Sequence, residues 1–579
     1  MSGLVGESHK AALQTLIDAY DRVDGMVSQG ASGPADSELV VLSAPMGWGK
    51  TRVVQEFYAH LAARQTAGTE YWPAELVPDV DRAPTLKSRK KVVPAAFDVA
   101  AEAEMPFLWW GVSCQKRQDD RLANVVADDI GQLAAHFGPT LNRLEANSAT
   151  RRAALGIART LSAAAPFSDI PGILDGLENL RTSIRDVFRA QRDKPRDREE
   201  LRRIDPSQSD GSLVETWVGA IGSLLRAARI PMVVVVDDAH WADPASIEFI
   251  DELLLRAPCL VAFTAWPDQL RIQETNDQPA DAGSLVGRWA DRTNLCDIAQ
   301  PAAGAAVELA ANTLKITTEH PLAVQLAERA QGNPLVLRLW AELPFVQQSA
   351  QGGNELAPED LDELPTDANA EFQRRWRELP EIVQAVLAPA AHQGITFVPA
   401  VVAETLATAG IGELSDSAQA LHDAEDPHWW IRELTADAHQ FTEPILRDIA
   451  AGRLSELHGA RQRRELNAAF VSTLARLKSS AEWQALTTTS RRALLAHHVA
   501  LAEKGERGDT QLLIETYQDL ADLQPESKTG WEEALSLINA ALNLQEHPDP
   551  ETTLALQLRK ANLLQSAGRA SDALPLYEQ

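Results

Sequence analysis

The stretch VVLSAPMGWGKTRVVQEF, residues 40–57, has the pattern of a buried strand, a glycine-rich turn and a helix. Residues Leu39 to Leu42 are continuously apolar and mostly β-branched, as in a strand that is covered on both faces. After the turn, apolar residues recur at helical spacing from Val53 to Leu61. This order of elements predicts an α/β domain that binds a phosphate-bearing ligand.

The turn from Ala44 to Thr51 matches the P-loop (Walker A) pattern, with Ala44 at a position where glycine is usual. Glycines allow backbone N–H groups to surround phosphate oxygens, and the following helix directs its positive end toward the same anion. Lys50 can reach the β- and γ-phosphates, and the Thr51 hydroxyl can hold Mg²⁺. The predicted cofactor-binding residues of the turn are Gly47, Trp48, Gly49, Lys50, Thr51 and Arg52, with Lys50 also catalytic and Thr51 also a metal ligand.

A second motif, IPMVVVVDDAHWADPAS at residues 230–246, supplies the acids that a P-loop ATPase requires (Walker B). An apolar strand from Met232 to Val236 ends in Asp237 and Asp238. We expect Asp237 to meet the water shell of the metal and Asp238 to orient or deprotonate the attacking water. The sequence contains no Asn/Thr-Lys-x-Asp stretch to recognise guanine, so ATP or ADP with Mg²⁺ is the predicted cofactor.

Together the P-loop and the stretch VVVVDDAHWADPAS resemble the STAND class of signal-transduction ATPases, relatives of AAA+ proteins, in the bacterial regulator branch with helical-repeat tails. The resemblance implies a switch that rests with ADP and assembles with ATP. It also implies that Pro334, in Gly332-Asn333-Pro334, packs beside the adenine base. Family members commonly have a phosphate-sensing arginine at the position of Trp266 and an ADP-contacting histidine at the position of Glu443.

The predicted fold is an α/β P-loop domain with a parallel sheet, followed by an all-α helical domain, a winged helix and tetratricopeptide-like repeats. Residues 531–544 and 559–579 share the spacing of such repeats. The chain ends inside the last repeat helix, so we expect further repeats in the natural protein. The predicted regions are a nucleotide-binding domain at 1–300 with insertions at about 65–104 and 147–211, a helical domain at 301–363, a winged-helix-like domain at 364–455 and helical repeats at 456–579.

Composition limits the partners and the compartment. The formal net charge is −28, which disfavours direct binding of nucleic acid or of an anionic membrane. The three cysteines show no paired spacing, which is typical of a reducing compartment. With neither a signal peptide nor a long apolar run, the sequence predicts a cytoplasmic protein without membrane contact.

The leading functional hypothesis is an ATP-binding regulatory switch with slow hydrolysis of ATP to ADP and phosphate. A protein or peptide ligand would bind the repeats, and the ATP state would form a homo-oligomer. One alternative is a transcription regulator whose DNA-binding module is missing from this chain. Another is a scaffold that keeps ATP or ADP bound without hydrolysing it.

Overall fold

The computed structural model describes most of the residues that lie outside the two predicted insertions. The described residues are 4–29, 37–64, 92, 107–114, 218–219, 221–222, 225–226, 229–273, 279–365, 368–410, 417–426, 428–442, 444–505, 509–524, 528–544, 550–567 and 569–578. The predicted insertions at 65–104 and 147–211 lie outside the described residues, apart from Val92, and so does Glu443.

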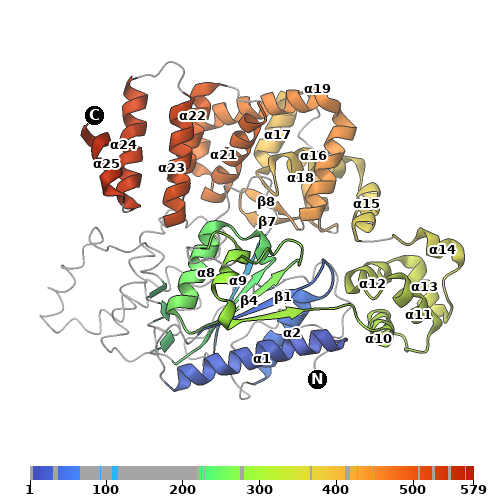
Figure 1. Ribbon diagram of the computed structural model, residues 1–579. Coiled ribbons are helices and arrows are strands. Elements are labelled where there is room, and N and C mark those ends of the chain that lie inside the picture. The colour runs from blue at the N-terminus through green and yellow to red at the C-terminus, as the bar shows by residue number, and fades with distance from the viewer. Residues whose placement is uncertain are drawn as a thin grey trace, which may run out of the picture.

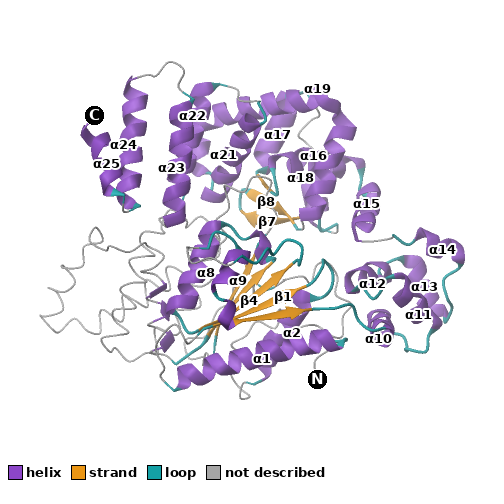
Figure 2. Ribbon diagram, viewed as in Figure 1, coloured by secondary structure: helices purple, strands orange, loops and turns teal. Residues whose placement is uncertain are grey.

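A five-stranded parallel sheet forms the centre of the nucleotide-binding region (Figures 1 and 2), in the order β2-β3-β4-β1-β5. Alternate side chains of one strand enter different cores: Val233 and Val235 face one, and Val234 and Val236 face the other. Burial on both faces explains why these strands are continuously apolar in sequence. The strands are β1 (Glu38–Ser43), β2 (Leu108–Ser113), β3 (Met232–Asp237), β4 (Cys259–Ala265) and β5 (Thr293–Asp297).

Helices cover both faces of the sheet, which confirms the predicted P-loop type of fold. Helices α1 (Glu7–Ser28) and α2 (Lys50–Ala63) pack in the core of one face. Helices α8 (Pro244–Arg256) and α9 (Ala282–Arg288) pack in the core of the other (Figure 1). Two short 3₁₀ helices, η6 (Ala239–Trp241) and η7 (Ala290–Arg292), follow β3 and α9.

Five short helices occupy the region predicted as the helical domain. Helices α11 to α14 have proline in the first turn, where its fixed φ suits the helix and its missing N–H costs nothing. The helices are α10 (Ala303–Leu314), α11 (Pro321–Arg329), α12 (Pro334–Ala341), α13 (Pro344–Gly352) and α14 (Pro358–Glu363).

The next region combines helices with a small antiparallel sheet of order β6-β8-β7. Helices followed by a hairpin are what the sequence predicts here, and the assignment to a winged helix stays a prediction. The elements are α15 (Ala368–Glu378), α16 (Glu381–Gln393), β6 (Thr396–Phe397), α17 (Pro399–Thr408), α18 (Ser417–Glu425), β7 (Ile431–Thr435) and β8 (Ala438–Phe441).

The C-terminal part is a stack of helices in which neighbours along the chain from α21 to α25 pack on each other. Its core includes Ala534, Ile538, Ala541, Ala561 and Ala573, which lie at the positions from which the repeats are predicted. This is a helical-repeat-like region, as expected, and the tetratricopeptide assignment stays a prediction. The helices are α19 (Pro444–Lys478), α20 (Ala481–Ala485), α21 (Thr488–Glu503), α22 (Thr510–Asp522), α23 (Lys528–Asn543), α24 (Pro550–Ser566) and α25 (Ala570–Glu578).

The boundary predicted between residues 455 and 456 falls within α19, a continuous helix of 35 residues. A shared helix connects the two regions more rigidly than a loop, because its backbone hydrogen bonds run across the boundary. Within the part of the chain that the structure describes, no helix has both the length and the apolar character needed to cross a bilayer.

Candidate nucleotide-binding site

The loop between β1 and α2 has the backbone conformation that its glycines permit. Gly47 has φ of 81° and Gly49 has φ of 83°, a left-handed conformation that side chains disfavour. Gly49 is the N-cap of α2, so the helix begins at Lys50 with its positive end at the loop. The predicted phosphate-binding loop therefore has its expected place at the carboxyl end of β1.

Lys50 is buried inside this loop. Its ammonium donates hydrogen bonds to the carbonyl oxygens of Ala44 and Pro45, at 2.7 and 3.1 Å. Burial lowers the pKa of Lys50, while the nearby carboxylates of Asp238 and Asp237 oppose that shift. The ammonium thus lies between the loop backbone and the acidic pair, where its positive charge would attract an anionic ligand.

Asp237 and Thr51, the two predicted metal ligands, meet directly. The Asp237 side chain is buried at the end of β3, and its Oδ1 accepts hydrogen bonds from Thr51 Oγ1 at 3.2 Å and Thr264 Oγ1 at 2.7 Å. The backbone N–H of Asp238 donates to the same Thr264 hydroxyl at 2.8 Å. Asp238 has φ of 56°, in the left-handed region, so the chain turns directly after the strand. Thr264 therefore connects the two acids.

These donors fit Mg²⁺. The cation prefers oxygen ligands and keeps several water molecules, so one hydroxyl, one carboxylate and substrate phosphates are enough to hold it. Thr51 and Asp237 provide the hydroxyl and the carboxylate side by side. Among the described residues, no group of three or more His, Cys, Asp or Glu side chains is placed so that it could hold a metal ion.

An aromatic group lies at the end of β4, where the resemblance stated above implies an arginine. The Trp266 backbone N–H donates to His240 Nδ1 at 3.4 Å. The His240 ring packs against Trp241 and Trp266, with centroids 4.7 and 5.0 Å away. Burial, with a smaller contribution from Lys50, lowers the pKa of His240 to about 4. The imidazole is therefore neutral at physiological pH, and this corner of the site has aromatic rather than cationic side chains.

The N-terminus of α12 contacts the P-loop. The Leu335 N–H donates to the Gly47 carbonyl oxygen at 3.2 Å, and the Asn333 side chain caps the helix by accepting from Leu335 N at 3.0 Å. A side chain at Gly47 would place its Cβ 2.7 Å from Leu335 Cβ. Pro334 is the first residue of α12, between Asn333 and Leu335, the two residues that approach the loop at Gly47.

Two other predicted residues have roles that the pattern alone did not specify. The Arg52 guanidinium pairs with Glu56, one turn later in α2, at 2.7 Å. Trp48 presents its carbonyl oxygen to His9 Nε2 at 2.8 Å. Sequence reasoning missed His9. Its spacing from Leu13 and Leu16 places it on the buried face of α1, and that periodicity was the available signal.

Comparisons with known proteins find an ATPase domain in this part of the chain. Residues 18–261 match the family model described as AAA ATPase domain. No curated protein matches the sequence.

Among solved structures, a STAND protein with a tetratricopeptide repeat sensor from Pyrococcus horikoshii aligns over 96% of this chain and 62% of its own, with 11% identity and a TM-score of 0.35. A Walker-type ATPase from Pyrococcus abyssi aligns over 76% of this chain and 94% of its own, with 10% identity and a TM-score of 0.30. This chain thus spans less than two thirds of the length of the first structure. Residues 18–261 are thus similar to AAA ATPase domains, in keeping with the P-loop type of fold of the described residues, and the motifs of the sequence resemble those of the STAND class of ATPases.

Proposed function

We propose that this protein is an ATP-dependent regulatory switch with slow turnover. The AAA ATPase domain supports the binding of a nucleoside triphosphate. In this proposal the ADP state is the resting state, a protein or peptide ligand binds the helical repeats, and exchange to ATP favours assembly into a homo-oligomer.

The predicted catalytic and metal-binding residues, together with Pro334, have chemical tasks in the nucleotide cycle. The backbone N–H groups of the loop and of the first turn of α2 bind phosphate oxygens, and Lys50 neutralises their charge. Thr51 and Asp237 would hold Mg²⁺, which would supply positive charge to offset the charge that develops during transfer. Asp238 orients the attacking water and accepts its proton. Pro334 would pack beside the base.

The observation that most supports a switch is that two downstream regions contact the nucleotide-binding domain. One contact is the hydrogen bond from the Leu335 N–H to the Gly47 carbonyl. The other is between repeat helix α23 and α8 (Figure 1). Helix α8 starts at Pro244, a few residues after the acidic pair, so a shift of α23 acts on the segment that holds Asp237 and Asp238. A ligand that binds differently to two positions of the repeats would therefore change the nucleotide site.

The proposed role as a switch also explains why turnover should be slow. A switch that hydrolysed ATP freely would not hold its ATP state. An arginine that stabilises the transition state is worth about 10³–10⁵ in rate, and Trp266 occupies the position where the resemblance implies one. We expect the isolated protein to turn over on the order of once per minute or less, well below the enzyme median of about 10 s⁻¹.

The test is to measure the ATPase rate per molecule over a wide range of protein concentrations, alongside light scattering. In the switch proposal, scattering rises with ATP but not ADP, and the rate per molecule rises with assembly. Lys50→Ala is the matched control, since it should lose both responses. A fast rate that is independent of concentration, from a protein that stays monomeric with ATP, would show a constitutive enzyme instead.

A non-hydrolysing scaffold is the second candidate, and the aromatic cluster of His240, Trp241 and Trp266 favours it. None of these side chains is a cation at neutral pH, so the cluster adds no positive charge to a transition state. Mass spectrometry of the purified protein distinguishes the two candidates. A scaffold would retain added ATP unchanged for hours, whereas the switch would convert it to ADP.

A further inference from the structure

His9, in the first turn of α1, occupies a slot between two glycines of different segments. A side chain at Gly6 would place its Cβ 2.9 Å from His9 Nδ1, and one at Gly49 would place its Cβ 3.2 Å from His9 Nε2. Both glycines have positive φ, so the backbone also disfavours side chains there. The imidazole is 4% exposed and fills the space that the two glycines leave.

The hydrogen bond of His9 fixes which ring nitrogen holds the proton. The Trp48 carbonyl oxygen can only accept, so Nε2, at 2.8 Å, is the donor. Nδ1 is buried without a hydrogen-bond partner among the described residues. A second proton on Nδ1 would have no acceptor, and burial lowers the pKa of His9. His9 is thus a neutral donor with one defined tautomer.

The direction of the Trp48 carbonyl matters for nucleotide binding. Trp48 lies between Gly47 and Gly49, which are both left-handed. In a phosphate-binding loop the backbone N–H groups face the anion, so the carbonyl groups have to point elsewhere. The His9 ring provides a hydrogen-bond donor for one of these carbonyls and thereby favours the loop conformation in which the N–H groups stay available.

The same turn of α1 also contacts the segment that leads to the helical domain. Ser8 Oγ donates to the Ala299 carbonyl oxygen at 3.2 Å. Ala299 lies just after β5 and before α10, where the chain leaves the sheet. The first turn of α1 therefore contacts the P-loop through His9 and the segment between β5 and α10 through Ser8.

We propose that His9 is a positioning residue for the P-loop, acting through the hydrogen bond from its Nε2–H to the Trp48 carbonyl oxygen. The inference rests on the proposed nucleotide binding at this loop. The ring itself touches no phosphate. It raises the affinity for the nucleotide by keeping the loop in its binding conformation before the ligand arrives, which removes the cost of ordering it on binding.

Three variants at His9 test the role of the donor. In His9→Gln the amide nitrogen reaches the position of Nε2 and can still donate, whereas in His9→Asn it reaches only the position of Nδ1. His9→Ala has no donor. We expect His9→Gln to bind ATP within about twofold of the wild type, and the other two to bind about three- to tenfold more weakly, the effect of one typical hydrogen bond.

The measurement is calorimetric titration with ATP and Mg²⁺, with the unfolding temperature of each variant recorded without nucleotide. His60→Asn, on the neighbouring helix α2, is the matched control and should bind as the wild type does. If the wild type binds no nucleotide, the proposed function fails. If the wild type binds and all three His9 variants bind equally well, or if Gln is as weak as Asn, the function stands and the role of His9 is refuted.

A second measurement covers the case in which His9→Asn or His9→Ala does not fold. ¹⁵N NMR of histidine-labelled wild-type protein, with the His9 signal identified from His9→Gln, reports the tautomer directly. The proposal requires a neutral ring protonated on Nε2. A ring protonated on Nδ1, or one that exchanges freely between the two tautomers, would overturn it.

Discussion

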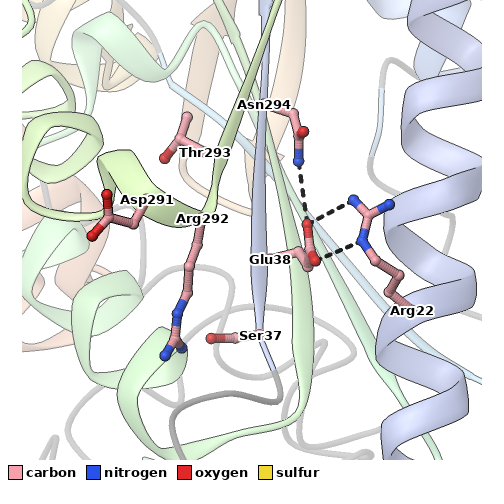
Figure 3. Close-up of a pocket in the computed structure, with 7 residues that line it drawn as sticks. All are labelled: Arg22, Ser37, Glu38, Asp291, Arg292, Thr293 and Asn294. Atoms are coloured by element: carbon pink, nitrogen blue, oxygen red, sulfur yellow. Dashed lines mark hydrogen bonds and ion pairs between the residues drawn. The ribbon is translucent and has the colours of Figure 1, made fainter.

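The two ends of the parallel sheet differ in the side chains that bind their buried or half-buried carboxylates. At the amino end, Glu38 accepts two hydrogen bonds from Arg22, at 2.7 and 2.9 Å, and one from Asn294 at 3.2 Å (Figure 3). At the carboxyl end, Asp237 accepts from the hydroxyls of Thr51 and Thr264. A guanidinium cancels the charge of its partner, whereas a hydroxyl satisfies a lone pair and leaves the charge in place.

The difference separates a structural site from a functional one. The pocket at the amino end has a cavity volume of about 290 Å³, and its charges include two arginines and two acids (Figure 3). Its ion pair joins two side chains of the protein itself, Arg22 and Glu38, and needs no ligand. At the carboxyl end, the charge of Asp237 remains available to a cation that arrives with phosphate. Variants at the two ends should therefore change different properties, turnover and affinity at one and stability at the other.

The largest expected effect is on turnover in Asp238→Asn. The amide cannot accept a proton from water, so we expect a loss of about 10²–10⁴ in the rate of ATP hydrolysis, the usual contribution of a general base. ATP binding should persist. Single-turnover hydrolysis and calorimetric titration of the same sample measure the two quantities. Asp237→Asn is the comparison, and it should weaken the Mg²⁺-dependent part of binding. Wild-type turnover in both variants would refute the roles given to this pair.

A smaller but clear effect is expected for ATP affinity in Lys50→Ala. The ammonium of Lys50 is the side-chain cation that lies buried inside the P-loop. Its charge-assisted hydrogen bonds are worth roughly 1.5–3 kcal/mol or more, which is about 10- to 150-fold in dissociation constant. Calorimetric titration with ATP and with ADP measures the loss. Unchanged affinity for both would show that the nucleotide binds elsewhere.

The strands and the P-loop could be predicted from sequence because their causes are local. A strand covered on both faces has to be apolar throughout, and a left-handed turn needs glycines at Gly47 and Gly49. The contacts of His9 with Trp48 and of Leu335 with Gly47 join segments that are far apart in the chain. Periodicity places His9 on the buried face of α1, but it does not encode either contact, because both arise only when the helices pack on the sheet.

The next expected effect is on the pH dependence of stability, in His240→Asn at the carboxyl end of the sheet. The folded pKa of His240 is lowered to about 4, below its ordinary value of 6.5. The unfolded chain therefore binds more protons between these values, and stability falls as pH decreases from 6.5 toward 4. In His240→Asn the side-chain oxygen can still accept from the Trp266 N–H but does not titrate.

We expect the stability of His240→Asn to depend less steeply on pH below 6.5, by at most about 1.4 kcal/mol per pH unit. Urea unfolding at pH 7, 6 and 5 measures this slope. Parallel slopes in variant and wild type would show that His240 gains or loses no proton on unfolding. ATP affinity at pH 7 should change little, because the ring is neutral there.

The smallest effect is expected at the amino end of the sheet, in Glu38→Gln. The Arg22 side chain is 48% exposed, and exposed or half-exposed ion pairs contribute about 0.2–1 kcal/mol. Glutamine keeps the shape and one acceptor, so the free energy of unfolding should fall by about 1 kcal/mol or less. Urea unfolding of Glu38→Gln, Arg22→Gln and the double variant gives the coupling energy of the pair.

ATP affinity and turnover should equal those of the wild type, because these residues lie at the opposite end of the strands from the P-loop. A loss of nucleotide affinity in Glu38→Gln, with the fold intact, would mean that the two ends of the sheet are energetically coupled and that the contrast between them is not one of structure against function.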